Sequence, residues 1–281
     1  MNIAIFVAYE PASCHFVNLE KVCSQFDSIV VVDNSVEFND FSGFQNVTAI
    51  HNANRGGIAG AFNAALDQLD LNQDDFIFTL DQDSNIPPGF VGSMVSFCKA
   101  KGCLAACPDF YDVNSASSAG FAVLSGVFYQ VNKHEYTDFC ISSGMCVHSS
   151  IYSKVRFDND FFIDHVDTDI CFKLKEIGCS IFINRDVVLQ HAIGCRSVES
   201  WLGLTIKPTR HNHIRRYFVI RNGWYLAWKY FFKYPGFFVL NVARTVHEII
   251  SVVFFEDNKI DKIVSMLKGF FHGAIGKLGG Y

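Results

Sequence analysis

The sequence has little charge and little proline for its length. Of its 281 residues, 18% are charged and six are proline, whereas half are hydrophobic and 29 are phenylalanine. A chain this apolar buries a large core, which excludes intrinsic disorder. It has no C-x-x-C motif, and no uncharged apolar run reaches the roughly 18 residues that span a bilayer. These absences argue against a structural zinc site and a simple membrane anchor, and they favour a large folded domain.

The N-terminal segment does not have the features of a signal peptide. The segment from Met1 to Val7 has no basic leader and no small-residue cleavage site. The ten cysteines are scattered through apolar segments rather than spaced as a disulfide framework. We therefore expect reduced core thiols in a cytoplasmic protein.

Charge is distributed unevenly along the chain. Residues 1–200 contain 11 Lys and Arg against 24 Asp and Glu, whereas residues 201–281 contain 12 against 4. The basic segment is also rich in Phe, Trp and Tyr. Two interpretations fit this composition: a packed helical subdomain with a solvated basic face, or a surface that contacts anionic membrane. No base-reading motif accompanies the charge, so we expect no nucleic-acid partner.

Short β-rich runs alternate with amphipathic stretches over the first hundred residues. This pattern predicts strands at 3–8, 29–32, 47–51, 76–81 and 104–107 in a parallel α/β sheet. Residues 110–150 are expected to form short antiparallel strands. Residues 180–184 and 187–190 are predicted as two further strands, and a helix is expected to start at Pro87-Pro88 and run to about Lys101.

The most informative motif is Asp81-Gln82-Asp83, where an apolar strand opens into two carboxylates. At the end of a strand, acids at positions i and i+2 converge on one hard cation and, through it, on a diphosphate. An EF-hand loop starts in the same way, but its sixth and twelfth positions would be Ile86 and Gly92 instead of Gly and Glu. An ordinary Asx turn before the Pro-Pro pair is the simpler alternative.

Other polar residues follow neighbouring strands. The carboxyl ends of parallel strands form the ligand crevice of an open α/β sheet, so segments 8–10, 33–35 and 81–83 should lie close together. Asp33 is placed to accept hydrogen bonds from a nucleoside, or only to close a turn. The Gly56-Gly57-x-x-Gly60 segment opens a helix but matches neither the dinucleotide fingerprint nor the P-loop.

A second acidic cluster supplies a candidate base. Asp164, Asp167 and Asp169 surround the start of a predicted helix, where acids also complement the helix dipole. Transfer of a sugar from a nucleoside diphosphate needs a cation for the leaving group and a carboxylate that takes the acceptor's proton. His191, 24 residues after Asp167, follows a predicted strand and is a candidate third ligand for Mg²⁺ or Mn²⁺.

Together these segments resemble the inverting family 2 glycosyltransferases of the GT-A fold, and within them bacterial rhamnosyltransferases. The resemblance covers most of residues 1–230. The motifs that carry it are Val31-Val32-Asp33-Asn34-Ser35, Asn54-x-Gly56-Gly57-x-Ala59-x-Ala61-x-Asn63, Leu80-Asp81-Gln82-Asp83-Ser84, Phe161-Phe162-Ile163-Asp164-x-Val166-Asp167-x-Asp169 and Arg221-Asn222. Strand one ends in Ala8-Tyr9-Glu10 and Lys173 follows the acidic cluster, where the family more often has a Thr-Tyr pair and Arg.

The resemblance implies roles for individual residues. It assigns the catalytic base to Asp167 and the metal and diphosphate site to Asp81, Asp83 and His191. The expected contacts with the nucleotide-sugar donor are Ala8, Tyr9, Asp33, Asn54, Arg55, Gly57, Asp81 and Gln82.

The sequence therefore predicts a GT-A, Rossmann-like nucleotide-diphospho-sugar transferase domain over residues 1–230 and a basic, aromatic helical extension over 231–281. The expected reaction moves L-rhamnose from dTDP-L-rhamnose to a hydroxyl of a growing surface polysaccharide such as O-antigen or capsule. UDP-galactofuranose or UDP-galactose are alternative donors. A non-catalytic nucleotide-sugar-binding assembly protein and a metal-dependent nucleotidyltransferase are remoter alternatives.

The expected partners follow from this reaction. They are a dTDP- or UDP-linked sugar, a glycan or lipid-linked glycan acceptor, Mg²⁺ or Mn²⁺, and an anionic membrane surface. Self-association into a homo-oligomer is a further expectation. From the cysteine usage and the basic, aromatic C-terminal segment, we expect the protein in the cytoplasm, peripherally at the inner face of the cytoplasmic membrane.

Overall fold

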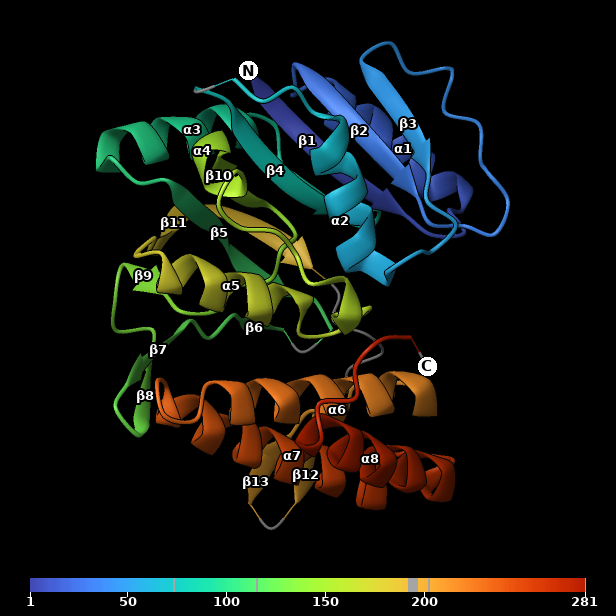
Figure 1. Cartoon of the computed structure of the whole chain (residues 1–281), viewed down its shortest axis with the longest axis vertical. Coiled ribbons are helices and arrows are strands. Elements are labelled where there is room, and N and C mark those ends of the chain that lie inside the picture. Colours follow the sequence, from blue (N-terminus) through green and yellow to red (C-terminus); the bar gives the residue numbers. More distant parts are fainter. Residues whose placement is uncertain (73, 115, 192–196, 202, 281) are drawn as a thin grey trace.

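The computed structural model describes residues 1–72, 74–114, 116–191, 197–201 and 203–280. An α/β domain forms one part, and three C-terminal helices form a separate layer against it (Figure 1). The strands are β1 (Asn2–Ala8), β2 (Ser28–Asp33), β3 (Val47–His51), β4 (Phe76–Asp81), β5 (Ala105–Asp112), β6 (Ser117–Ser118), β7 (Ala122–Ser125), β8 (Phe128–Val131), β9 (Tyr136–Thr137), β10 (Met145–His148), β11 (Ile181–His191), β12 (Glu199–Trp201) and β13 (Leu204–Ile206). The helices are α1 (Ser13–Cys23), α2 (Gly57–Gln68), α3 (Phe90–Lys101), α4 (Ser149–Tyr152), the 3₁₀ turn η1 (Asn159–Phe161), α5 (Val166–Glu176), α6 (His213–Lys229), α7 (Pro235–Phe255) and α8 (Lys259–Ala274).

The central sheet confirms the predicted α/β class. Its strand order is β3-β2-β1-β4-β10-β5-β11-β9, with β6 paired to β5. The pairs β3–β2, β2–β1, β1–β4 and β5–β11 are parallel, whereas β10 runs antiparallel between β4 and β5. Strands β1, β2 and β4 are almost entirely buried, as expected for parallel strands covered on both faces.

Two local predictions were wrong in detail. The two strands expected at 180–184 and 187–190 are one strand, β11, which continues through a bulge between Asn184 and Val188. A bulge inserts extra residues without ending the pairing, so the polar Asn184-Arg185-Asp186 segment looks like a turn in the sequence. The helix after Pro87-Pro88 begins only at Phe90, after Gly89 in a left-handed conformation.

The C-terminal helices pack around a fully buried arginine side chain, that of Arg216. Arg216 of α6 forms ion pairs with Glu248 of α7 and with Glu256, and Lys262 of α8 contacts the same Glu256 at 2.8 Å. A buried charge is tolerated when it is paired in this way. The network ties α6 to α7 and α8, while α6 also contacts the α/β domain. The domain boundary at residue 230 stays a prediction.

Helix α7 is long and apolar enough to cross a membrane by length and composition, although only 28% of its most apolar window is buried inside the protein. The helix nevertheless contains two charged residues, Arg244 and Glu248. Both charged residues line a pocket facing the α/β domain. The helix therefore has one polar inner face.

Candidate active site

The carboxyl ends of β1, β2 and β4 are joined by hydrogen bonds, as predicted. The Tyr9 amide donates to Oε1 of Gln82 at 2.8 Å, and the Glu10 amide donates to Oγ of Ser35 at 2.8 Å. Three loops that are far apart in the sequence thus meet at one edge of the sheet. This edge is the ligand crevice of an open α/β sheet.

Asp81 closes β4 and starts a tight turn. The Ser84 amide donates to the Asp81 carbonyl oxygen at 2.9 Å, and the Asp81 amide donates to Oγ of Ser84 at 2.9 Å. Burial, together with the charges of Asp83 and Asp167, raises the pKa of the Asp81 carboxyl to about 7, although the charge of Arg215 acts to lower it. Clustered carboxylates of this kind fit a divalent cation, which would offset their mutual repulsion.

The turn that carries Asp83 also reaches the end of β11. Asn85 forms an isolated antiparallel bridge with Gln190, the residue before His191. At the same place, His191 pairs with Asp112 at the end of β5. The backbone of His191 is therefore brought beside the Asp83 turn, although its imidazole lies outside the described part of the chain.

Asp81 and Asp83 remain the two described members of the predicted metal set. Among the described residues, no group of three His, Cys, Asp or Glu side chains forms a ready cation site. The chemistry of Asp81 and Asp83 fits Mg²⁺ or Mn²⁺, which prefer carboxylate oxygens. The three-residue site stays a prediction.

Asp33 is fully buried at the end of β2. Its carboxylate accepts hydrogen bonds from the Ser35 amide at 2.9 Å and from the Asn39 amide at 2.7 Å. Although burial acts to raise the pKa of Asp33, hydrogen bonds from Ser35 and Asn39 lower it below its usual value. The carboxylate shapes the loop 34–39, and its contact with a nucleotide stays a prediction.

The remaining predicted donor contacts lie at this same edge. Ala8 is buried at the end of β1, Tyr9 is exposed beside it, and Arg55 is exposed before α2, where it lines a small pocket with Gly56. Asn54 has a left-handed backbone, with φ of 54°. Gly57 is needed for packing, because a Cβ there would lie 2.1 Å from the carbonyl oxygen of Phe162.

The segment before α5 has an unusual backbone. Phe162, Asp164 and His165 all have positive φ, between 59° and 62°. Nδ2 of Asn222 in α6 lies 2.8–2.9 Å from the carbonyl oxygens of Phe161, Ile163 and Asp164. Such conformations persist where surrounding contacts hold them. The Arg221-Asn222 motif therefore has a structural explanation: α6 holds the loop that leads into Asp167.

Asp167 is the first acid of α5. Its Oδ1 accepts the Thr168 amide at 2.8 Å. Burial raises the pKa of Asp167 to about 6; the Thr168 amide lowers it, Asp164 raises it and Arg244 lowers it. A carboxylate in this range is ionised at neutral pH and is still basic enough to accept a proton.

The other two acids of the cluster have different surroundings. Asp164 forms a fork-like ion pair with Arg215 of α6, whose Nε and Nη2 lie 3.1–3.2 Å from the carboxylate. Asp169 is buried and pairs with Lys173 at 2.7 Å and Lys229 at 3.5 Å. Asp169 therefore links α5 to α6. Of the three, Asp167 is the one suited to act as a base.

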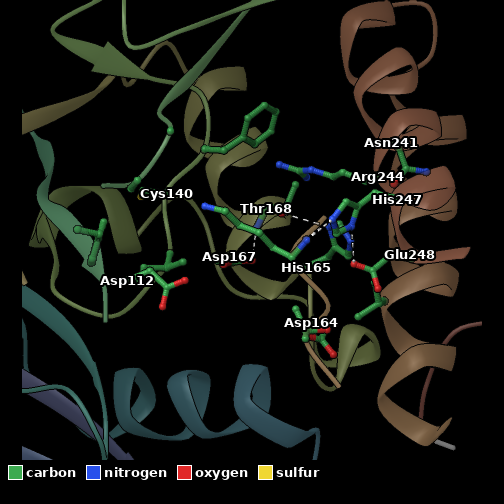
Figure 2. A pocket seen from close by; sticks show the side chains of 18 of the residues that line it. Asp112, Cys140, Asp164, His165, Asp167, Thr168, Asn241, Arg244, His247 and Glu248 are labelled. Atoms are coloured by element: carbon green, nitrogen blue, oxygen red, sulfur yellow. Dashed lines mark hydrogen bonds and ion pairs between the residues drawn. The ribbon is translucent and has the colours of Figure 1, made fainter. Parts of the chain in front are cut away.

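A cavity of about 680 Å³ lies between the α/β domain and α7, with Asp167 and Thr168 on one side and Asn241, Arg244 and Glu248 on the other (Figure 2). Arg244 projects from α7 towards Asp167. The wall of the cavity also includes Asp112 and the aromatic residues Phe110, Phe121 and Phe139. Polar groups and aromatic faces together are typical of sites for small polar ligands.

Residues 18–157 match glycosyl transferase family 2. The whole chain is also 27% identical over 296 residues to dTDP-rhamnosyl transferase RfbF of Shigella flexneri, covering 99% of this chain and 96% of RfbF. The chain contains a family 2 glycosyltransferase domain.

Solved structures of similar fold agree with the GT-A architecture of this glycosyltransferase. S. aureus TarS 1–349 superposes with a TM-score of 0.60 at 13% identity, covering 97% of this chain and 80% of that one. GalNAc-T7, solved with UDP, GalNAc and Mn²⁺, gives a TM-score of 0.54 at 13% identity, covering 88% of this chain and 54% of that one. At these identities the likeness concerns the fold.

Three residues that line the cavity were not singled out from the sequence. Arg244, Asn241 and Glu248 come from α7, beyond the predicted catalytic domain. The signal was present, because an arginine and a glutamate four residues apart interrupt an otherwise apolar helix. Charged residues in such a helix point to a polar partner or a site. Asp167, whose charge interacts with that of Arg244, is 77 residues away in the sequence and could not be identified from spacing.

Proposed function

We propose that this glycosyltransferase transfers L-rhamnose from dTDP-L-rhamnose to an acceptor hydroxyl by a single displacement with inversion. The observation that carries the proposal is the carboxylate of Asp167, which faces the cavity and has a pKa raised to about 6. A positioned carboxylate of this kind can take the acceptor's proton while the hydroxyl oxygen attacks the anomeric carbon. A single displacement from the opposite face inverts the anomeric configuration.

The protein's own residues set up this step on the acceptor side. The Thr168 amide fixes Oδ1 of Asp167, and we assign the second oxygen, Oδ2, to the acceptor's proton. Asn222 holds the preceding loop, so the carboxylate is positioned before substrate arrives. Arg244 supplies a positive charge that keeps the base ionised.

On the donor side, we propose that Asp81, Asp83 and His191 hold a Mg²⁺ or Mn²⁺ ion. When bound, the ion stabilises the charge of the departing nucleoside diphosphate. The Gln82 side chain, which accepts the Tyr9 amide, keeps the Asp81-Gln82-Asp83 turn against the end of β1. The predicted contacts of Asp33, Asn54 and Arg55 with the nucleotide belong to the same proposal.

The choice of sugar rests on the relative RfbF, whose name gives a dTDP-rhamnosyl transfer. We therefore favour dTDP-L-rhamnose over UDP-galactofuranose or UDP-galactose. We propose a glycan or lipid-linked glycan of a bacterial surface polysaccharide as acceptor. The cavity fits this class, because sugars present hydroxyls to polar groups and apolar ring faces to aromatic side chains.

A thermal-shift panel of nucleotide sugars tests the donor. We expect dTDP-L-rhamnose with Mn²⁺ to raise the melting temperature, and UDP-galactofuranose and UDP-galactose to leave it unchanged. Stabilisation by a UDP-sugar alone would replace the proposed donor while keeping the reaction class. NMR of the product should then show the inverted anomeric configuration; retention would contradict the single displacement.

A further inference from the structure

The outer face of α7 and α8 is apolar although it faces solvent. In α8, exposed apolar side chains recur every three or four residues and so share one face: Ile260, Val264, Leu267 and Phe271. A second such stripe lies on α7: Val239, Val242, Val246, Ile249 and Val253. We call these two stripes together the α7–α8 outer face.

The packing of α8 explains why its large side chains point outwards. Its buried face includes Ser265, Gly269 and Gly273. A Cβ on Gly269 would lie 2.6 Å from the Tyr217 carbonyl oxygen, and one on Gly273 would be as crowded by Arg221. The small residues thus let α8 approach α6 closely. Because the small face is used inside, the bulky apolar residues remain outside, the reverse of a usual surface helix.

Aromatic and basic residues border this face. Phe232, in the connection between α6 and α7, is 96% exposed, and Trp228 at the end of α6 is also exposed. Lys259, Lys268 and Lys277 are exposed along α8 and after it. Of the four acidic residues after position 200, Glu248 and Glu256 are turned inwards onto Arg216. The other two, Asp257 and Asp261, are exposed around the start of α8. Three exposed lysines against these two acids leave the border of the outer face with an excess of positive charge.

We propose that the α7–α8 outer face docks onto an anionic lipid bilayer, with both helices lying in the interface. Apolar stripes bordered by lysines and aromatic rings match the acyl boundary and the anionic headgroups of such a surface. If a second copy of the chain docked here, the lysines that border the face in each copy would repel those of the other. This repulsion disfavours self-association through the α7–α8 outer face.

Helix α7 lies on the membrane in this arrangement and does not cross it. Its other face carries Arg244 and Glu248 into the cavity beside Asp167, and Glu248 is paired with Arg216. A crossing helix would have to remove these charges from their partners and place them in hydrocarbon. Because α7 contributes to both surfaces, docking holds the cavity next to the membrane. The inference goes beyond the transfer reaction and does not depend on the donor.

Vesicle sedimentation with the full chain tests the proposal. We expect binding to vesicles of phosphatidylcholine with phosphatidylglycerol, weakening with added salt, and little binding to phosphatidylcholine alone. The double variant Leu267→Gln/Phe271→Gln should partition at least about tenfold more weakly. The matched control is Val127→Gln/Phe128→Gln, which removes exposed apolar side chains of the β7–β8 hairpin region and should bind as the wild type.

Charge reversal provides a second, independent variant. Lys259→Glu/Lys268→Glu leaves the apolar stripes intact and should weaken binding to anionic vesicles at least about tenfold. Equal binding of the wild type and both α8 variants would overturn the proposal, as would equal loss in the hairpin control. A dimer in light scattering that dissociates in Leu267→Gln/Phe271→Gln, without vesicle binding by the wild type, would instead assign the face to self-association. Donor-induced thermal shifts should persist in every variant, which separates this test from that of the reaction.

Discussion

Arg244 of α7 faces Asp167 of α5 across the cavity, one residue from each part of the molecule (Figure 2). Burial raises the pKa of Asp167 to about 6, while the positive charge of Arg244 acts to lower it. The C-terminal helices therefore do more than pack against the α/β domain, because they help to set the protonation of the proposed base.

Replacement of the base tests its role directly. Asp167→Asn removes the proton acceptor with little change in shape, and we expect turnover to fall by roughly 10²–10⁴-fold with donor affinity unchanged. Steady-state kinetics and donor titration measure the two quantities. Asp169→Asn is the matched control two residues away: it breaks contacts with Lys173 and Lys229 and should mainly lower stability. Near-normal turnover of Asp167→Asn would remove this residue from the mechanism.

The pH dependence should report the same carboxyl. The base acts when ionised, so kcat/KM should rise with pH and level off above about 6. In Arg244→Met the cation that lowers the pKa of Asp167 is gone, and the acidic limb should move to higher pH. Arg156→Met, a half-exposed arginine that contacts Asp67 at 3.9 Å, should leave the limb in place. An identical profile in all three proteins would show that Arg244 does not influence the base.

Asp81 should destabilise the metal-free protein at neutral pH. Burial and the charges of Asp83 and Asp167 raise the pKa of Asp81 to about 7 from an ordinary value of 3.8. The folded state thus binds more protons than the unfolded state between these values, and stability is lost as pH rises from about 4 to about 7. Asp81→Asn should therefore raise the free energy of unfolding at pH 8 by about 1–2 kcal/mol, after allowance for solvent screening.

Denaturant unfolding in the presence of a chelator measures this effect. At pH 4 the difference between Asp81→Asn and the wild type should disappear. Asp70→Asn, which changes an exposed acid, should have no effect at either pH. Added Mn²⁺ should stabilise the wild type more than Asp81→Asn. A variant less stable than the wild type at pH 8 would show that the carboxylate has a stabilising partner.

Asn222 should be required for the shape of the loop before Asp167. In Asn222→Asp the side chain keeps its size but a carboxylate would face the carbonyl oxygens of Phe161, Ile163 and Asp164. We expect a loss of about 1–3 kcal/mol in the free energy of unfolding and a lower kcat in the protein that remains folded. Asn114→Asp, at an exposed position, is the control for the change in charge. Wild-type stability and kcat in Asn222→Asp would show that the loop keeps its conformation without α6.

Much of the fold followed from local patterns. Strand β4 ending at Asp81, the Gly-opened helix α2 and the short antiparallel strands after residue 110 were all predicted, because alternation and turn residues act over a few positions. The continuous strand β11 was missed. Its polar bulge is held by pairing with β5, a partner some 75 residues earlier that local pattern does not reveal.

The sequence by itself determined the class of the protein. An apolar strand that opens into Asp81 and Asp83, and a helix that starts with Asp167, are patterns of neighbouring residues, so they can be recognised without knowledge of the packing. Only the tertiary structure decided that Asp164 pairs with Arg215 and Asp169 with Lys173 and Lys229. It also decided that Asn222 holds the loop and that Arg244 stands opposite Asp167. These depend on the direction of each side chain and on contacts between distant elements. The pKa values of Asp81 and Asp167 depend on their burial and on the charges that the fold brings near them, and the order of residues in the sequence gives neither.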